Sequence, residues 1–86
     1  MGQLMRGGQF PSRQAAIDDA NKQFRSTFGN DIKFPDGDEG SLVQNASNAA
    51  WSFRVVNPFG KELGHYDVRC MSEEVFWLGI SCQVKL

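Results

Sequence analysis

The stretch 51–70, WSFRVVNPFGKELGHYDVRC, contains two apolar alternations separated by a turn. Apolar residues occupy every second position from Trp51 to Val55, and again from Tyr66 to Cys70. A two-residue period is that of a β-strand with one buried face. Between the runs, the segment NPFG (57–60) has Asn, Pro and Gly at positions that a type I turn favours. The stretch therefore predicts an antiparallel hairpin.

The register of this hairpin follows from the side chains that must share a face. Directly paired residues point to the same side of a sheet, so apolar residues must pair with apolar residues. A four-residue loop that closes on Asn57 opposite Glu62 pairs Phe53 with Tyr66. A three-residue loop with a bulge at Gly60 would set an apolar residue against a charged one. We therefore predict the four-residue loop.

A second hairpin extends the sheet into the stretch EEVFWLGISCQVKL (73–86). From Phe76 to Leu86 every second residue is apolar, again with the period of a strand. The same pairing rule favours a five-residue connection, 71–75, with Cys70 opposite Phe76. The predicted rows facing the core are Trp51–Val68–Leu78 and Phe53–Tyr66–Ile80.

The other side of these strands carries polar residues and one tryptophan, Trp77. Its predicted rows are Arg69–Trp77, Ser52–Asp67–Gly79, Arg54–His65–Ser81 and Val56–Leu63–Gln83. Only one clear helix is available to cover a sheet, so this second face is expected to be exposed, as in many antiparallel sheets. Arg69 and Trp77 are expected to form a cation–π pair there, worth about 0.5–1 kcal/mol.

The segment PSRQAAIDDANKQFRSTFG (11–29) has the apolar spacing of an amphipathic helix. Ser12 is placed to cap its first turn, and Gly29 stands where a helix commonly ends. Residues 41–49 fit either a short helix or a strand, and we favour the strand. Residues 1–10 hold three glycines and little periodicity. We interpret them as a flexible N-terminal arm.

Together these patterns predict one α+β domain over 11–86, in which an N-terminal helix packs on an antiparallel β-meander of three to four strands. A length of 86 residues leaves no room for a second core. No apolar run is long enough to span a bilayer, and the first residues lack the apolar stretch of a secretory signal. A cytoplasmic protein without membrane association is the expectation.

The two cysteines test the predicted register. Cys70 and Cys82 lie six positions apart along the sheet, about 20 Å at the rise of a strand. A disulfide needs α-carbons within about 7 Å. We therefore expect both thiols to be reduced and buried, in keeping with an intracellular protein.

No motif predicts catalysis, a metal or a cofactor. His65 is the only histidine, and the positions of the two cysteines lack the spacing of a zinc site. The acidic segment 36–40, DGDEG, departs from a calcium loop at its fifth position, so an acidic turn is the better interpretation. The sequence therefore favours a non-enzymatic protein.

The exposed face is the candidate working surface, because Trp and Arg are enriched at interface hot spots. We predict a small protein-interaction module, a regulator or inhibitor, that binds another protein through this face or through an edge strand at 75–86. The residues expected to contact the partner are Trp77, Arg69, Arg54, His65 and Asp67. Two other partners stay open. Exposed aromatic and arginine side chains on a sheet also suit single-stranded nucleic acid, although a net charge of −1 disfavours it. A second copy could pair along the edge strand. Covering of Trp77 by residues 1–10 or 41–49 is the structural alternative.

Overall fold

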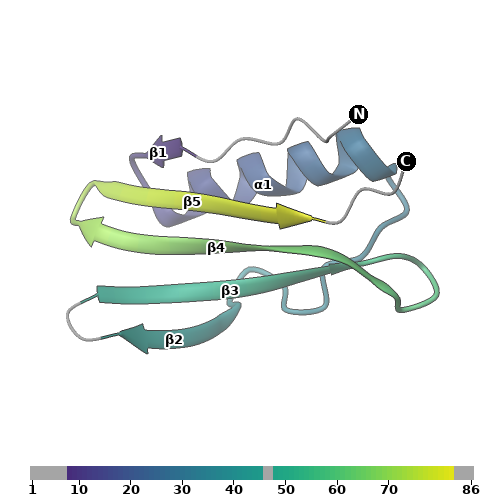
Figure 1. Ribbon diagram of the computed structural model, residues 1–86. Coiled ribbons are helices and arrows are strands. Elements are labelled where there is room, and N and C mark those ends of the chain that lie inside the picture. Colours follow the sequence, from purple (N-terminus) through teal and green to yellow (C-terminus); the bar gives the residue numbers. More distant parts are fainter. Residues whose placement is uncertain (1–7, 46–47, 83–86) are drawn as a thin grey trace.

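The computed structural model describes residues 8–45 and 48–82 of the chain. It contains one helix and five strands, all paired antiparallel in the order β1-β5-β4-β3-β2. Their bounds are β1 (Gly8–Phe10), α1 (Arg13–Phe28), β2 (Ser41–Asn45), β3 (Asn48–Val56), β4 (Glu62–Ser72) and β5 (Val75–Cys82). The helix α1 crosses one face of the sheet (Figure 1). The predicted α+β class is confirmed, with one strand more than the upper limit of the prediction.

The helix begins and ends where its capping residues predict. The Ser12 hydroxyl accepts a hydrogen bond from the Ala15 amide at 3.1 Å. At the other end, the Gly29 amide donates to the Arg25 carbonyl at 2.9 Å, with φ of Gly29 at 103°. Four residues on the inner stripe are buried: Ala16, Ile17, Ala20 and Phe24. The small residues at the start of the stripe let the helix lie close to the sheet.

Two short strands complete the sheet on either side of the meander. Residues Gly8–Phe10, which the sequence analysis placed in the flexible arm, form β1 and pair with Phe76–Leu78 of β5. The rest of that predicted arm lies outside the described residues. On the other side, Ser41–Asn45 form β2, which confirms the strand interpretation of this segment. Along Phe76–Leu78, therefore, β5 is not the edge strand that we expected.

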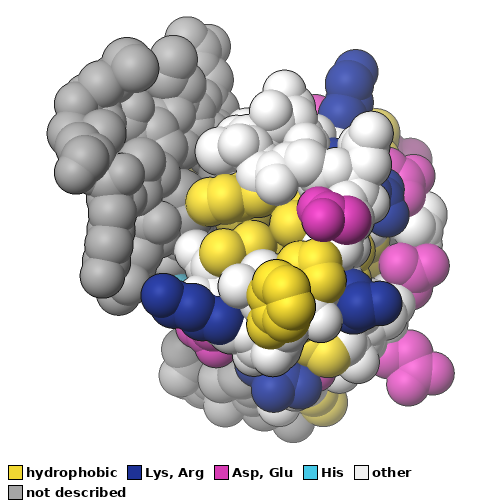
Figure 2. Space-filling model, turned by 90° about the vertical axis from the view of Figure 1, so that its right-hand side faces the viewer, with side chains coloured by type: hydrophobic (Ala, Val, Ile, Leu, Met, Phe, Trp, Pro, Cys, Tyr) yellow, Lys and Arg dark blue, Asp and Glu magenta, His cyan; other side chains and the backbone are white. Residues whose placement is uncertain are grey.

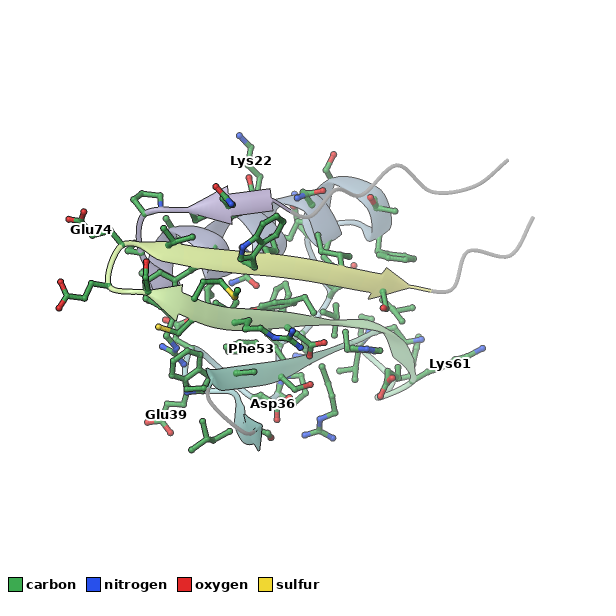
Figure 3. All side chains as sticks on the ribbon, turned by 60° about the vertical axis from the view of Figure 1, so that its left-hand side comes forward. Lys22, Asp36, Glu39, Phe53, Lys61 and Glu74 are labelled. Atoms are coloured by element: carbon green, nitrogen blue, oxygen red, sulfur yellow. The ribbon has the colours of Figure 1, made fainter. Side chains whose placement is uncertain are left out.

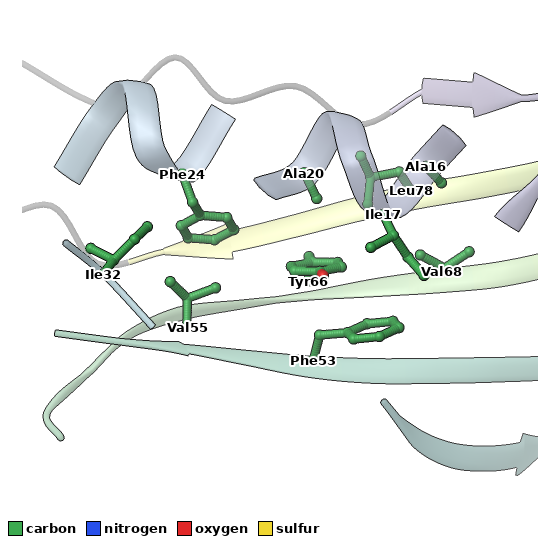
Figure 4. Close-up of a cluster of buried hydrophobic side chains, with 10 residues drawn as sticks. All are labelled: Ala16, Ile17, Ala20, Phe24, Ile32, Phe53, Val55, Tyr66, Val68 and Leu78. Atoms are coloured by element: carbon green, nitrogen blue, oxygen red, sulfur yellow. The ribbon is translucent and has the colours of Figure 1, made fainter. Parts of the chain in front are cut away.

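The core lies between α1 and the sheet, and aromatic rings fill its centre (Figure 4). Phe53 and Tyr66 are fully buried and stack with ring centroids 4.6 Å apart. The Tyr66 hydroxyl donates to the Asn21 side-chain oxygen of α1 at 2.9 Å. Burial raises the pKa of Tyr66, so this hydroxyl keeps its proton at neutral pH and the hydrogen bond persists.

The two predicted core rows are confirmed. Trp51 pairs with Val68 and Val68 with Leu78, while Phe53 pairs with Tyr66 and Tyr66 with Ile80. Alternating apolar residues were therefore sufficient to identify the face that meets the helix.

The predicted loop of the first hairpin is wrong in length. The Asn57 amide donates to the Lys61 carbonyl at 2.8 Å, which leaves a three-residue loop in place of four. Val56 then pairs with Glu62 and Val55 with Gly64, so Leu63 is an extra residue on β4. This bulge restores the apolar pairing that the shorter loop would otherwise break. The predicted pairing of Val56 with Leu63 is wrong for the same reason.

The second hairpin has the predicted register and a tighter turn. Cys70 pairs with Phe76 as expected, but Ser72 also pairs with Val75 after an irregularity between Cys70 and Ser72. The connection therefore narrows to Glu73 and Glu74, in place of the predicted 71–75.

The cysteines are far apart along the sheet, as predicted. Cys70 carries a free thiol and is half-buried, where full burial was expected. The register places Cys82 opposite Gly64, six positions from Cys70 along β4. The side chain of Cys82 lies outside the described residues. Within the described part of the chain, no helix is long and apolar enough to cross a membrane.

Candidate functional site

The face of the sheet opposite α1, here called the open face, carries all five residues that the sequence predicted for partner binding. Arg69 pairs with Trp77, and Arg54 pairs with His65. Asp67 lies in the row between these two pairs. Figure 3 shows the side chains of this sheet as sticks. The strand register therefore brings the predicted residues together on one surface.

A pocket of about 400 Å³ opens on this face between β4 and β5. It is lined by Asp67, Arg69, Met71, Trp77, Leu78 and Gly79. Trp77 and Met71 are 45% and 46% exposed, so two large apolar side chains are available at its edge. A β-carbon built on Gly79 would meet no atom within 4 Å. The missing side chain of Gly79 thus leaves the space that the pocket occupies.

Met71 is a pocket residue that sequence reasoning missed. We placed it in the connection of the second hairpin, where its direction was undefined. In the structure β4 continues to Ser72, and Met71 shares the open face with Asp67 and Arg69. The sequence held no signal for this tight turn, because two-residue hairpin turns favour Asn, Asp and Gly, whereas the turn here is Glu73–Glu74.

The two charged residues of the pocket have no partner within residues 8–45 and 48–82. Among the described residues, neither Asp67 nor Arg69 has a hydrogen bond, an ion pair or an aromatic contact. The predicted cation–π pair of Arg69 with Trp77 is therefore wrong, since cross-strand pairing brings two α-carbons together without directing the side chains. Arg13 of α1 does lie over a tryptophan, 4.7 Å from the ring centroid of Trp51 on the opposite face.

Arg54, by contrast, is held by an internal partner. Its guanidinium donates two hydrogen bonds to the Asp36 carboxylate, at 3.0 and 3.1 Å, and its backbone amide donates a third at 2.7 Å. Its side chain stays 57% exposed. The hydrogen bonds from Arg54 lower the pKa of Asp36. Arg54 thus lies on the open face with its charge already compensated.

The Asp36 carboxylate also completes the outer edge of β3. Ser52 pairs with Ser41 of β2, and two residues later the Arg54 amide is satisfied by Asp36. Two residues further on, Val56 exchanges both backbone hydrogen bonds with Lys33, at 2.8 and 3.0 Å. A side chain and an isolated bridge therefore replace a neighbouring strand along this part of the edge.

We expect Asp36→Asn to lower the melting temperature at neutral pH, because the neutral amide loses the ion pair and one acceptor oxygen. The folded-state pKa of Asp36 lies below its ordinary value of 3.8. Its stabilising contribution is therefore complete above that value and is lost as the pH falls through the folded-state pKa. Thermal unfolding of both chains from neutral to strongly acidic pH measures this. The gap in melting temperature should close below the ordinary pKa, and a gap that stays constant would contradict the assignment.

The acidic turn, residues 36–40, makes contacts with both the sheet and the helix. Asp36 binds Arg54 of β3, and the Glu39 carbonyl accepts a hydrogen bond from the Arg13 guanidinium of α1 at 2.6 Å. The described residues contain no group of three or more His, Cys, Asp and Glu side chains that could hold a metal ion. The sequence interpretation of this segment as a turn agrees with its structure.

Neither segment suspected of covering Trp77 does so with its described residues. Gln9 pairs with Trp77 through the strand ladder, so β1 lies beside β5 and not over its face. The Trp77 side chain stays 45% exposed. Residues 41–45 form β2 at the opposite side of the sheet (Figure 1). Comparisons with protein-family models, with curated proteins and with solved structures find no match to this chain.

Proposed function

We propose that this chain is a non-enzymatic protein-interaction module that binds another protein through the open face of its sheet. The observation that carries the proposal is the pocket beside Trp77. It combines half-exposed Trp77 and Met71 with two charged residues that lack a partner in the described part of the chain. Interfaces commonly place an aromatic or Arg anchor beside an apolar pocket, with polar groups around it.

The charges of this face favour a protein over a single-stranded nucleic acid. A nucleic-acid surface needs several cations free to meet phosphates. Here Arg54 is compensated by Asp36, and Asp67 lies in the row between Arg54 and Arg69. Arg69 is thus the single uncompensated arginine among the five predicted contact residues.

We expect a double variant, Trp77→Ala with Arg69→Ala, to lose the partner that the wild-type chain captures from a lysate of its native host. Once the partner is purified, its dissociation constant should rise at least about thirtyfold, the effect of the roughly 2 kcal/mol that one hot-spot residue alone contributes. Capture followed by mass spectrometry, and then titration calorimetry, measure both effects.

Leu42→Ala serves as the matched control, because Leu42 is 60% exposed but lies on β2, away from the pocket. The control should capture the same partner as the wild type. Equal capture by all three chains would contradict the proposal. Quenching of the Trp77 fluorescence by single-stranded oligonucleotides, strong at low salt and lost at moderate salt, would instead indicate nucleic-acid binding.

A further inference from the structure

The β3–β4 loop presents a phenylalanine in a fixed position. Phe59 is 94% exposed, the largest exposed fraction among the large apolar residues described. The Asn57 side-chain oxygen accepts hydrogen bonds from the Phe59 and Lys61 amides, both at 2.9 Å. The Gly60 amide donates to the Asn57 carbonyl at 2.9 Å. Three hydrogen bonds to one asparagine therefore order the loop before any contact is made, which lowers the entropic cost of binding through it.

Phe59 and the loop that carries it, residues 58–60 and here called the tip, cannot reach the pocket of their own chain. Figure 1 shows the β3–β4 loop at one end of the sheet and the β4–β5 turn at the other. Lys61 and Glu74, labelled in Figure 3, mark these two ends. Met71 lies ten positions beyond Lys61 along β4, about 33 Å at the rise of an extended strand. Any Phe59 that enters such a pocket must come from another molecule.

The residues next to the two surfaces differ in charge. Lys61 directly follows the β3–β4 loop, and the bridge of Lys33 to Val56 places a second lysine near it, with Asp31 and Glu62 as acidic neighbours. Figure 2 faces this end of the molecule and shows apolar side chains at the surface, with both basic and acidic side chains around them. Around the pocket lie Asp67, Glu73 and Glu74, with Arg69 as the basic neighbour. Lys61, two residues after Phe59, and the Glu73–Glu74 turn beside the pocket can therefore attract each other.

We infer that a second copy of this chain inserts Phe59 into the pocket above Gly79. A volume of about 400 Å³ admits a phenyl ring, and Trp77 and Met71 provide an apolar lining. The contact joins two different surfaces, so each added copy still offers a free tip and a free pocket. Such a head-to-tail contact builds open chains, not closed dimers. The inference rests on the pocket of the proposed function, and self-association competes there with the partner.

Sedimentation velocity over a wide range of protein concentration tests the inference. The average mass of the wild-type chain should rise with concentration beyond that of a dimer. Phe59→Ala removes the inserted ring and should weaken association at least about tenfold. Gly79→Val places a branched side chain in the pocket, and its β-carbon would meet no atom within 4 Å, so the fold is retained. A wild-type chain that stays monomeric at the highest concentration would overturn the inference.

Two control variants remove or add an exposed apolar side chain at positions outside the proposed contact. Leu42→Ala removes an exposed apolar side chain from β2, and Ser81→Val adds one to the open face two residues beyond Gly79. Both should associate as the wild type does. Association that is as sensitive to these variants as to Phe59→Ala would overturn the inference.

Mixing the two defective chains gives the sharpest test. The Phe59→Ala chain keeps its pocket, and the Gly79→Val chain keeps its Phe59. In a mixture, the Phe59 of one chain can enter the pocket of the other, but no further contact is possible, so assembly must stop at a dimer. Dimers in the mixture, from two monomeric variants, support the inference, and their absence overturns it. Phe59→Ala leaves the pocket intact for a different partner. If the double variant Trp77→Ala with Arg69→Ala captures the partner as well as the wild type does and the mixture still forms dimers, the proposed function is refuted and the self-association stands.

Discussion

Phe53→Ala is expected to lower the free energy of unfolding by about 3–5 kcal/mol, the usual cost of removing a buried aromatic ring. Phe53 is fully buried, and its ring stacks on Tyr66 at 4.6 Å with an interplanar angle of 9°. The variant loses this contact and leaves a cavity between β3, β4 and α1. A domain of this size has a total stability of about 4–13 kcal/mol. Urea denaturation followed by circular dichroism measures the loss.

Phe59→Ala is the matched control, because it deletes the same side chain from a position that is 94% exposed. It should change the unfolding free energy by no more than about 0.5 kcal/mol in dilute solution. Similar losses for the two variants would show that Phe53 does not occupy the centre of the core.

Gly40→Ala is expected to destabilise the fold by about 2–5 kcal/mol, although it adds a single methyl group. Gly40 has φ of 69°, a left-handed conformation that costs a residue with a β-carbon about 1–2 kcal/mol. The added β-carbon would also lie 2.7 Å from two ring carbons of Phe53 and 3.0 Å from the Ser52 carbonyl oxygen. Relieving this overlap by moving a buried ring costs a further 1–3 kcal/mol, roughly. Equilibrium denaturation measures the total.

Gly37→Ala separates these two costs. Gly37 has φ of 62°, but a β-carbon there would meet nothing within 4 Å. It should lose only the conformational term of about 1–2 kcal/mol. In a Phe53→Leu background, the excess cost of Gly40→Ala should shrink, because the smaller side chain makes room. Equal costs for Gly37→Ala and Gly40→Ala would refute the predicted contact with Phe53.

The sequence predicted the two faces of the sheet because alternation depends only on whether positions are odd or even. That property also explains the error in the first hairpin. A loop shortened by one residue and a bulge at Leu63 compensate each other, so Phe53 pairs with Tyr66 in both arrangements. Apolar alternation cannot distinguish them. Loop length depends instead on the local hydrogen bonds that the Asn57 side chain accepts from the Phe59 and Lys61 amides.

Two features that sequence reasoning missed depend on contacts between distant segments. The three residues of β1 carry no strand pattern of their own and gain their pairing from β5. The contact of Asp36 with Arg54 needs the acidic turn to fold back along β3. The alternation nevertheless placed Trp77, Arg69, Arg54, His65 and Asp67 on the open face, although it missed Met71. Which of the two arginines has its charge compensated was not predictable, since that depends on Asp36.

The pairing of β1 with β5 has a consequence for the order of folding. Gly8 pairs with Leu78, so the two strands lie seventy residues apart in the chain, while β3, β4 and β5 are joined by short turns. During synthesis β1 and α1 emerge long before β5, which both of them contact. Pairings of high sequence separation form slowly, because a long loop must close first. We therefore expect the meander to form before β1 docks, leaving Phe76–Leu78 briefly open to other strands during each folding event.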